Sequence, residues 1–177
     1  MPAENEFKWV LEIDPEGIGA AMTAIPGTRT TSLRQGYVTP ENRVREIVED
    51  GKTSYLFTFK YPVAGELLEL EQPISKEDFD ALWSVCDLRL AKTRFVLAQE
   101  EAHWDVDLLA ENGDVYCALA EAEVARGLGR PALLPALAPF LVAAVDDRKT
   151  WSNHALSDPM RARVLIEHLR ETIARQG

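Results

Sequence analysis

Through the first two thirds of the chain, apolar and polar residues alternate in short segments, which is the pattern of strands with one buried face. Clusters of Gly, Asn, Asp and Pro separate these segments, and Glu49-Asp-Gly and Glu111-Asn-Gly-Asp are typical of hairpin turns. The alternation predicts strands at residues 4–11, 33–38, 43–49, 54–61, 66–74, 89–99, 102–109 and 115–125.

Two segments change to helical periodicity. One helix is predicted after Ser75, a good N-cap, with an apolar stripe of Phe79, Leu82, Trp83 and Cys86. A second is predicted at residues 159–175, where Leu165, Leu169 and Ile173 recur at intervals of four and need a surface to pack against. The uncharged stretch 131–145 holds three prolines, so we expect a packed loop with a short helix there.

Neither a membrane span nor a secretory leader is indicated. The stretch 131–145 is shorter than the roughly 20 apolar residues that a spanning helix needs. The start of the sequence has neither a basic segment nor an apolar segment of the kind that begins a signal peptide. We therefore expect a cytoplasmic protein with no membrane partner.

Length, net charge and cysteine spacing further narrow the class of protein. A chain of 177 residues with 46% hydrophobic content is long enough for one sizeable core. The net charge of −10 disfavours a nucleic-acid partner, because such binding needs a positive surface field. Cys86 and Cys117 lie far apart without a Cys-x-x-Cys spacing, so buried free thiols are expected in place of a disulfide or a zinc site.

The polar positions of the strands carry like charges two residues apart, so each pair points to one face of its strand. The basic pairs are Arg43 with Arg45 and Lys92 with Arg94, and Lys60 follows on another strand. The acidic pairs are Glu4 with Glu6, followed by Lys8, then Glu69 with Glu71, Asp105 with Asp107, and Glu121 with Glu123.

For a single strand such a pair is most simply a solvent-facing surface. Repetition along so many strands favours another interpretation, because adjacent like charges repel unless opposite charges or ligands face them. A sheet closed into a barrel would enclose both sets in a wet, charged lumen. Clustered carboxylates suit Mg²⁺ or Mn²⁺, and Lys and Arg suit phosphate oxygens, so the pattern predicts a metal–polyphosphate site.

The order of these segments resembles the CYTH superfamily, the triphosphate tunnel metalloenzymes, whose mark is an N-terminal Glu-x-Glu-x-Lys strand. That mark corresponds to Glu4-Asn-Glu6-Phe-Lys8. The family's further segments correspond to Leu33-Arg-Gln-Gly-Tyr-Val, Arg43-Val-Arg45, Thr58-Phe-Lys60, Glu69-Leu-Glu71, Lys92-Thr-Arg94, Trp104-Asp-Val-Asp107 and Ala120-Glu121-Ala-Glu123. The segment Lys149-Thr-Trp-Ser-Asn-His-Ala-Leu resembles a diverged form of the family's closing stretch.

The resemblance implies an α+β fold, a closed antiparallel β-barrel of about eight strands with flanking helices. The tunnel domain would span residues 1–156, with residues 157–177 as a helix packed on it. The implied activity is metal-dependent hydrolysis of a small-molecule triphosphate, inorganic tripolyphosphate first. Three other functions stay open: a thiamine triphosphatase, a class IV adenylate cyclase and a diverged, non-catalytic polyphosphate-binding module. Association into a homodimer also stays open.

The resemblance also implies roles for single residues. Metal ligands would be Glu4, Glu6, Asp107, Glu121 and Glu123, and phosphate-binding residues Lys8, Arg43, Arg45, Lys60, Arg94 and Lys149. Catalytic candidates are Glu6 and Glu69 as proton acceptors, with Lys8 beside them. Four side chains would alternatively pair across the lumen and hold the basic residues in place: Glu69, Glu71, Lys92 and Asp105.

Two positions depart from the family pattern, because members often carry Arg where Leu67 stands and near Thr150. Losing a preorganised donor costs on the order of 10²–10³ in rate, so the departures predict a weakened enzyme. The three histidines have no ligand spacing, and Gly127-Leu-Gly129-Arg130 lacks the remainder of a phosphate-loop motif, so a surface loop is expected there.

Overall fold

The computed structural model describes residues 4–63, 66–99 and 101–176, with the side chains of residues 4, 66 and 67 outside the described part. The chain divides into two compact units, and each is described by itself. Unit 1 comprises Met1–Thr30 and Thr93–Gly177, and unit 2 comprises Thr31–Lys92.

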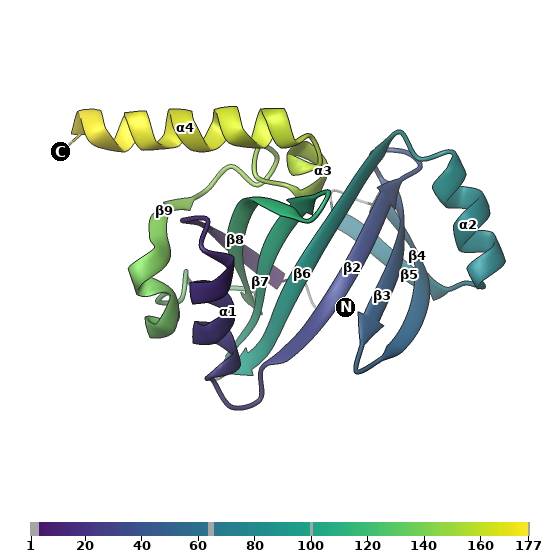
Figure 1. Ribbon diagram of the computed structural model, residues 1–177, viewed down its shortest axis with the longest axis horizontal. Coiled ribbons are helices and arrows are strands. Elements are labelled where there is room, and N and C mark those ends of the chain that lie inside the picture. Colours follow the sequence, from purple (N-terminus) through teal and green to yellow (C-terminus); the bar gives the residue numbers. More distant parts are fainter. Residues whose placement is uncertain (1–3, 64–65, 100, 177) are drawn as a thin grey trace. The chain divides into compact units, whose positions relative to one another are not determined.

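The strands are largely those that the alternation predicts (Figure 1). They are β1 (Glu4–Leu11), β2 (Arg29–Tyr37), β3 (Asn42–Glu49), β4 (Lys52–Val63), β5 (Glu66–Pro73), β6 (Leu88–Gln99), β7 (Ala102–Glu111), β8 (Asp114–Ala125) and β9 (Leu141–Val145). The helices are α1 (Pro15–Thr23), α2 (Lys76–Ser84), α3 (Asn153–Leu156) and α4 (Pro159–Gln176), with the 3₁₀ helix η1 (Pro135–Phe140).

In unit 2 the strands pair in the order β5-β4-β3-β2, and the pairings of β2 with β3, β3 with β4 and β4 with β5 are antiparallel. The β3–β4 connection places Asp50 and Gly51 at positive φ, 49° and 72°, as the predicted hairpin turn requires. Helix α2 begins after Ser75, whose side chain accepts a hydrogen bond from the Asp78 amide, as predicted. Its Phe79 is completely buried against one face of the sheet, together with Val44.

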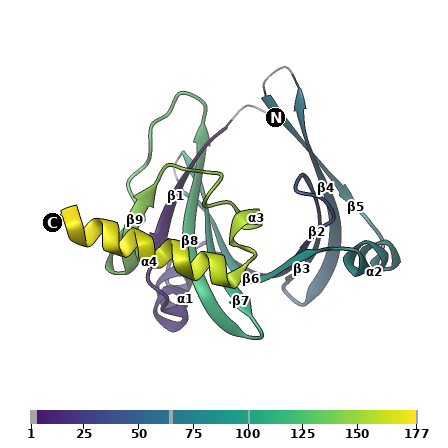
Figure 2. The ribbon, with the colours of Figure 1, turned by 90° about the horizontal axis from the view of Figure 1, so that it is seen from above.

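In unit 1 the strands follow the order β6-β7-β8-β1-β9. One sheet face packs an apolar core of alternate strand residues, among them Trp9, Trp104 and Ala120, against Ile18 of α1 and Leu137 of η1. Figure 2 shows α4 crossing this unit beside β8. The β7–β8 turn has Asn112 and Gly113 at positive φ, which confirms the second predicted hairpin.

Several elements differ from the sequence expectation, and the short helix α3 was not predicted. Residues 131–145 contain the expected loop, at residues 131–134, and the expected short helix, η1, but the expectation is wrong for Leu141–Val145, which forms β9 and pairs with β1. Helix α1 was not predicted, because Gly17 and Gly19 are poor helix formers. The helix forms nevertheless, since the Asp14 side chain caps its N-terminus. In α4 the buried residues are Ala162 and Ile166, whereas Ile173 of the predicted stripe is 41% exposed.

The antiparallel, mostly β architecture with a few helices is confirmed, while closure into a barrel is not. The order of the described strands does not return on itself, because β5 of unit 2 and β9 of unit 1 are its two edge strands. In the part of the chain that the structure describes, no helix combines the length and the apolar composition of a membrane span.

Both cysteines are buried and free, as expected. Burial raises the pKa of Cys86 above its ordinary value and that of Cys117 to about 12. Because the thiolate is the reactive form, neither side chain is suited to nucleophilic chemistry near neutral pH.

Candidate functional site

In unit 1 the N-terminal Glu-x-Glu-x-Lys strand places Lys8 between two carboxylates. Strand register sets Lys8 opposite Glu121 and Glu6 opposite Glu123. The Lys8 Nζ lies 2.6 Å from Glu121 Oε1 and 2.7 Å from Glu6 Oε1. Burial alone would lower the pKa of Lys8, but the charges of Glu121 and Glu6 outweigh it and raise the pKa. Lys8 is therefore a permanent cation here and not a proton acceptor.

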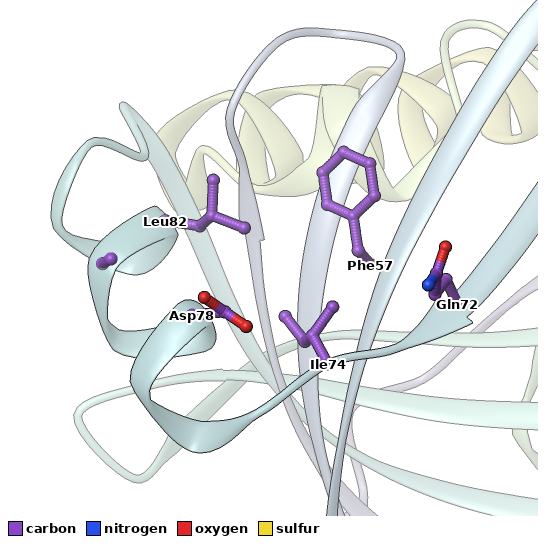
Figure 3. Close-up of a pocket in the computed structure, with 6 residues that line it drawn as sticks. Phe57, Gln72, Ile74, Asp78 and Leu82 are labelled. Carbon is purple, nitrogen blue, oxygen red and sulfur yellow. The ribbon is translucent and has the colours of Figure 1, made fainter.

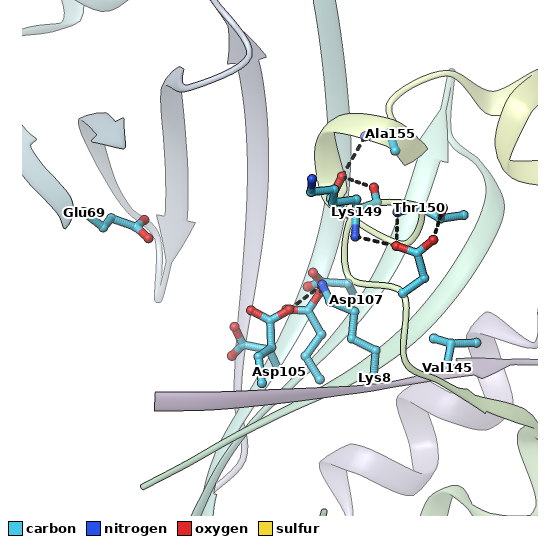
Figure 4. A network of polar contacts seen from close by, with 12 residues as sticks. Lys8, Glu69, Asp105, Asp107, Val145, Lys149, Thr150 and Ala155 are labelled. Atoms are coloured by element: carbon cyan, nitrogen blue, oxygen red, sulfur yellow. Dashed lines mark hydrogen bonds and ion pairs between the residues drawn. The ribbon is translucent and has the colours of Figure 1, made fainter. Parts of the chain in front are cut away.

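A second charged group on the same face centres on Arg94 of β6. Its Nε and Nη2 atoms donate to the two carboxylate oxygens of Asp107, at 2.7 and 2.6 Å, and Nη1 pairs with Asp105. Asp107 is completely buried, and the Nε2 of His103 lies 3.3 Å from Asp105. Burial acts against the charged form of Arg94, yet Asp107 and Asp105 together raise its pKa. Figure 4 shows Lys8, Asp105 and Asp107 close together.

The pleat explains why these charges gather. Residues of β1, β7 and β8 at alternate positions point to opposite faces, so Trp9, Trp104 and Ala120 enter the apolar core while Lys8, Asp105 and Glu121 point the other way. The core therefore fixes the direction of the charged side chains on β1, β7 and β8.

In unit 2 the basic residues of β3 and β4 meet the acidic residues of β5. Glu69 accepts from Arg43 Nη2 and lies beside Lys60 Nζ, both at 2.9 Å. Arg45 Nη2 pairs with Glu71 and also donates to Thr58 Oγ1 at 3.1 Å.

Glu69 is held ionised by its neighbours. Burial would raise its pKa, but the hydrogen bond from Lys60 and the charges of Arg43, Lys60 and Arg45 together lower it below the ordinary value. A carboxylate with a lowered pKa is a weak proton acceptor, so the structure favours the pairing role for Glu69 over the catalytic one.

Polar residues without formal charge complete the unit 2 face, and sequence analysis assigned them no role. Gln35 and Thr58 are almost fully buried, and Gln35 Nε2 donates to the Tyr37 hydroxyl at 2.6 Å. Gln35 lies opposite Arg45 and Tyr37 opposite Arg43 in the β2–β3 register. The alternation itself contained this signal, because Gln35 and Tyr37 have the same spacing as the charged pairs.

The remaining predicted residues are placed as follows. The Lys149 side chain is exposed, in a turn where Asp147 Oδ1 accepts from the Lys149 and Thr150 amides at 3.0 and 3.1 Å. The Thr150 hydroxyl donates to Asp147 at 2.6 Å, so it stabilises that turn (Figure 4). Glu123 is partly buried. The Glu4 and Leu67 side chains lie outside the described residues.

A pocket of about 440 Å³ lies elsewhere in unit 2, lined by Phe57, Gln72, Ile74, Asp78, Ala81 and Leu82 (Figure 3). Phe57 and Gln72 are register partners one position away from Thr58 and Glu71. The pocket therefore belongs to the α2 face and is separate from the charged face.

The acidic residues offer the right donor atoms for a hard divalent cation, but not a preassembled cage. Among the described residues, no group of three Asp, Glu, His or Cys side chains is arranged to hold a metal ion. Lys8 and Arg94 already bind carboxylate oxygens that such an ion would need as ligands. Mg²⁺ commonly takes one or two carboxylates and completes its shell with substrate phosphates, so these residues fit an ion that arrives with a polyphosphate.

No protein-family model and no curated protein matches the chain. Among solved structures, the hypothetical protein NE1496 is 22% identical, with 88% of this chain and 97% of that chain covered and a TM-score of 0.53. The PH1819 protein from Pyrococcus horikoshii is 17% identical, covering 96% and 89%, with a TM-score of 0.49. A "putative adenylate cyclase" from Vibrio parahaemolyticus is 15% identical, covering 94% and 87%, with a TM-score of 0.43. The first of these likenesses shows a shared fold alone.

Proposed function

We propose that this chain binds a small-molecule triphosphate and hydrolyses it with the help of Mg²⁺ or Mn²⁺, inorganic tripolyphosphate being the first substrate. One observation carries the proposal. In each unit one sheet face is packed with apolar side chains, while the other face holds charged side chains that are nevertheless buried, such as Lys8, Arg45, Asp107 and Glu121.

Burial of so many charges argues for a role beyond folding. Removing a charged group from water costs several kcal/mol, and ion pairing recovers this only with excellent geometry. Well-packed apolar residues of similar volume are often as stable or more stable at such positions. A chain that keeps Lys8, Arg45 and Arg94 in these surroundings therefore retains charge that a ligand can use.

The basic side chains of Arg43, Arg45 and Lys60, the unit 2 cations, have a spacing that suits a chain of linked phosphates. Arg43 and Arg45 are two residues apart on one strand face, hence separated by roughly 6.6 Å along the strand. Guanidinium groups donate two parallel hydrogen bonds to phosphate oxygens, and Lys60 adds a compact charge. Cations repeated along a strand suit successive phosphate groups better than a single orthophosphate.

The residues of unit 1 supply the complementary chemistry. A bound divalent ion would neutralise charge on the phosphates and help to activate water. Glu6 and Glu121 would contribute carboxylate oxygens, with Glu123 and Glu4 as further proposed ligands, while Asp107 fixes the Arg94 guanidinium. Lys8 is proposed to act as a cation toward phosphate, and Glu6 as the proton acceptor.

The resemblance to the CYTH superfamily supports this reading, since the charged segments occur in the family's order. We include in the proposal the closed barrel that the resemblance implies, with the charged side chains in its lumen. Lys149 is proposed to contribute a further donor from its exposed turn.

A second candidate function is a polyphosphate-binding module without turnover. Two observations favour it: the described acidic residues do not form a three-ligand group, and Thr150 holds a turn where the family often has Arg nearby. Binding would persist in such a module because the unit 2 cations are in place.

Ligand-dependent stabilisation tests both candidates at once. A ligand at about one hundred times its Kd stabilises the folded state by about 2.7 kcal/mol. For a chain of this size that corresponds to a rise in Tm of about 5–10 °C. We expect this rise with tripolyphosphate plus Mg²⁺, measured by differential scanning fluorimetry, and a smaller one for Arg45→Ala. Absence of any shift at millimolar ligand would contradict the proposed site.

A further inference from the structure

Two carboxylates of β5 occupy the anion positions of the unit 2 cations. Glu69 lies 2.9 Å from both Arg43 Nη2 and Lys60 Nζ, and Glu71 pairs with Arg45. The acidic residues are two apart on β5, as the arginines are on β3, so the two strands present matched rows of opposite charge.

The ion pairs of the chain differ in whether the acidic or the basic side chain is more exposed, and in these two pairs it is the acidic one. The Arg43 and Arg45 side chains are 16% and 11% exposed, whereas those of Glu69 and Glu71 are 32% and 44% exposed. On the α2 face the pair of Arg34 with Glu46 is reversed, with the arginine 49% and the glutamate 17% exposed. In unit 1 Asp107 is inaccessible. In the pairs of Arg43 and Arg45, therefore, the arginine is the more buried partner and the carboxylate is the exchangeable one, while Lys60 and Glu69 are equally exposed at 32%.

Strand β5 is also lightly held on its other face. It is an edge strand of unit 2, and its outward Leu68 and Leu70 are 45% and 54% exposed. Edge strands with little side-chain packing open at low free-energy cost. The carboxylate side chains of Glu69 and Glu71 can thus move away from the cations while the Phe79 core, which packs against β3, β4 and Ile74 after the end of β5, stays in place.

We propose that Glu69 and Glu71 are exchangeable counter-anions that determine specificity: they hold the unit 2 cations until phosphate oxygens displace them. An anion must then outcompete two carboxylates, which favours a linked, highly charged polyphosphate and excludes weakly charged ions. The carboxylates would also recapture the cations as product leaves. This inference rests on the proposed function, because it assumes that phosphate is the competing anion.

Removing one counter-anion should strengthen anion binding. We expect Glu71→Gln and Glu69→Gln to bind tripolyphosphate about tenfold more tightly than the wild type, since a charge-assisted hydrogen bond no longer has to be broken, and to gain more than this for orthophosphate, so that the preference for tripolyphosphate falls. Isothermal titration calorimetry in the presence of a chelator would measure both ligands. Glu46→Gln is the matched control, because it removes the same charge from a paired glutamate on the opposite face and should leave both affinities unchanged.

The outcomes separate this inference from the proposed function. If the wild type binds tripolyphosphate and the two variants bind equally or more weakly, the carboxylates only position the cations and the inference is overturned. If only the variants bind, the inference holds and the proposed function of the wild type fails. If no protein binds either anion, both fail. Melting curves of the two single variants verify that each protein is folded.

Discussion

Replacing Asp107 with Asn should lower the free energy of unfolding by about 3 kcal/mol, because it leaves Arg94, whose side chain is only 17% exposed, without its main counter-charge. Asp107 is completely buried and accepts two hydrogen bonds from Arg94. Asp105 still pairs with the guanidinium, so we place the loss at the lower end of the range for broken buried pairs. Urea unfolding followed by circular dichroism would measure it.

The matched control is Glu171→Gln, which breaks the exposed pair with Arg175 on α4. Exposed helix pairs contribute little, so this variant should unfold at nearly the wild-type urea concentration. An Asp107→Asn variant as stable as the control would mean that Arg94 does not depend on Asp107. The account of the charged face of unit 1 would then be wrong.

Replacing Glu121 with Gln should reduce metal-dependent phosphate release from tripolyphosphate by about 10²-fold or more, since a preorganised charged group at a reacting phosphate has effects of this size. Two causes act together. The amide is a poor substitute for a carboxylate as a ligand of a hard cation. It also removes one of the two carboxylates that hold Lys8, which is 2.6 Å away.

Steady-state kinetics at several Mg²⁺ concentrations would separate these causes, because a lost metal ligand is partly compensated by more metal. Glu111→Gln serves as the control, since Glu111 is exposed at the end of β7 next to a hairpin turn. Wild-type turnover in a folded Glu121→Gln variant would exclude Glu121 from the machinery.

Strand positions and faces could be predicted because alternation is a local property. Residues 4–11 were predicted without error as β1, and both hairpin turns were correct, since Asp50-Gly51 and Asn112-Gly113 adopt the positive φ values that such turns need. Strand β9 was missed because Leu141–Val145 is uniformly apolar and becomes a strand through pairing with β1, which is a tertiary effect.

The sequence predicts which face of each strand the charged side chains occupy. It does not predict which acidic side chain pairs with which basic one. Charges at i and i+2 share a face, and this places Arg43 with Arg45 and Glu69 with Glu71. Which carboxylate meets which cation depends on register between strands, so the shared contact of Glu69 with Arg43 and Lys60 could not be read from the sequence. Gln35 and Thr58 could be recognised only through their spacing, Gln35 with Tyr37 and Thr58 with Lys60, because a single uncharged polar residue is common on any strand.

Phosphate release from tripolyphosphate, with Mg²⁺ and Mn²⁺ each tested and ATP, thiamine triphosphate and pyrophosphate compared alongside, tests the central claim most directly. The account predicts metal-dependent release from tripolyphosphate that a chelator abolishes, with pyrophosphate a poor substrate because it engages fewer of the cations. If no triphosphate is hydrolysed with either metal, and tripolyphosphate neither binds nor stabilises the folded protein, the charged strand faces serve another purpose and the proposed function is contradicted.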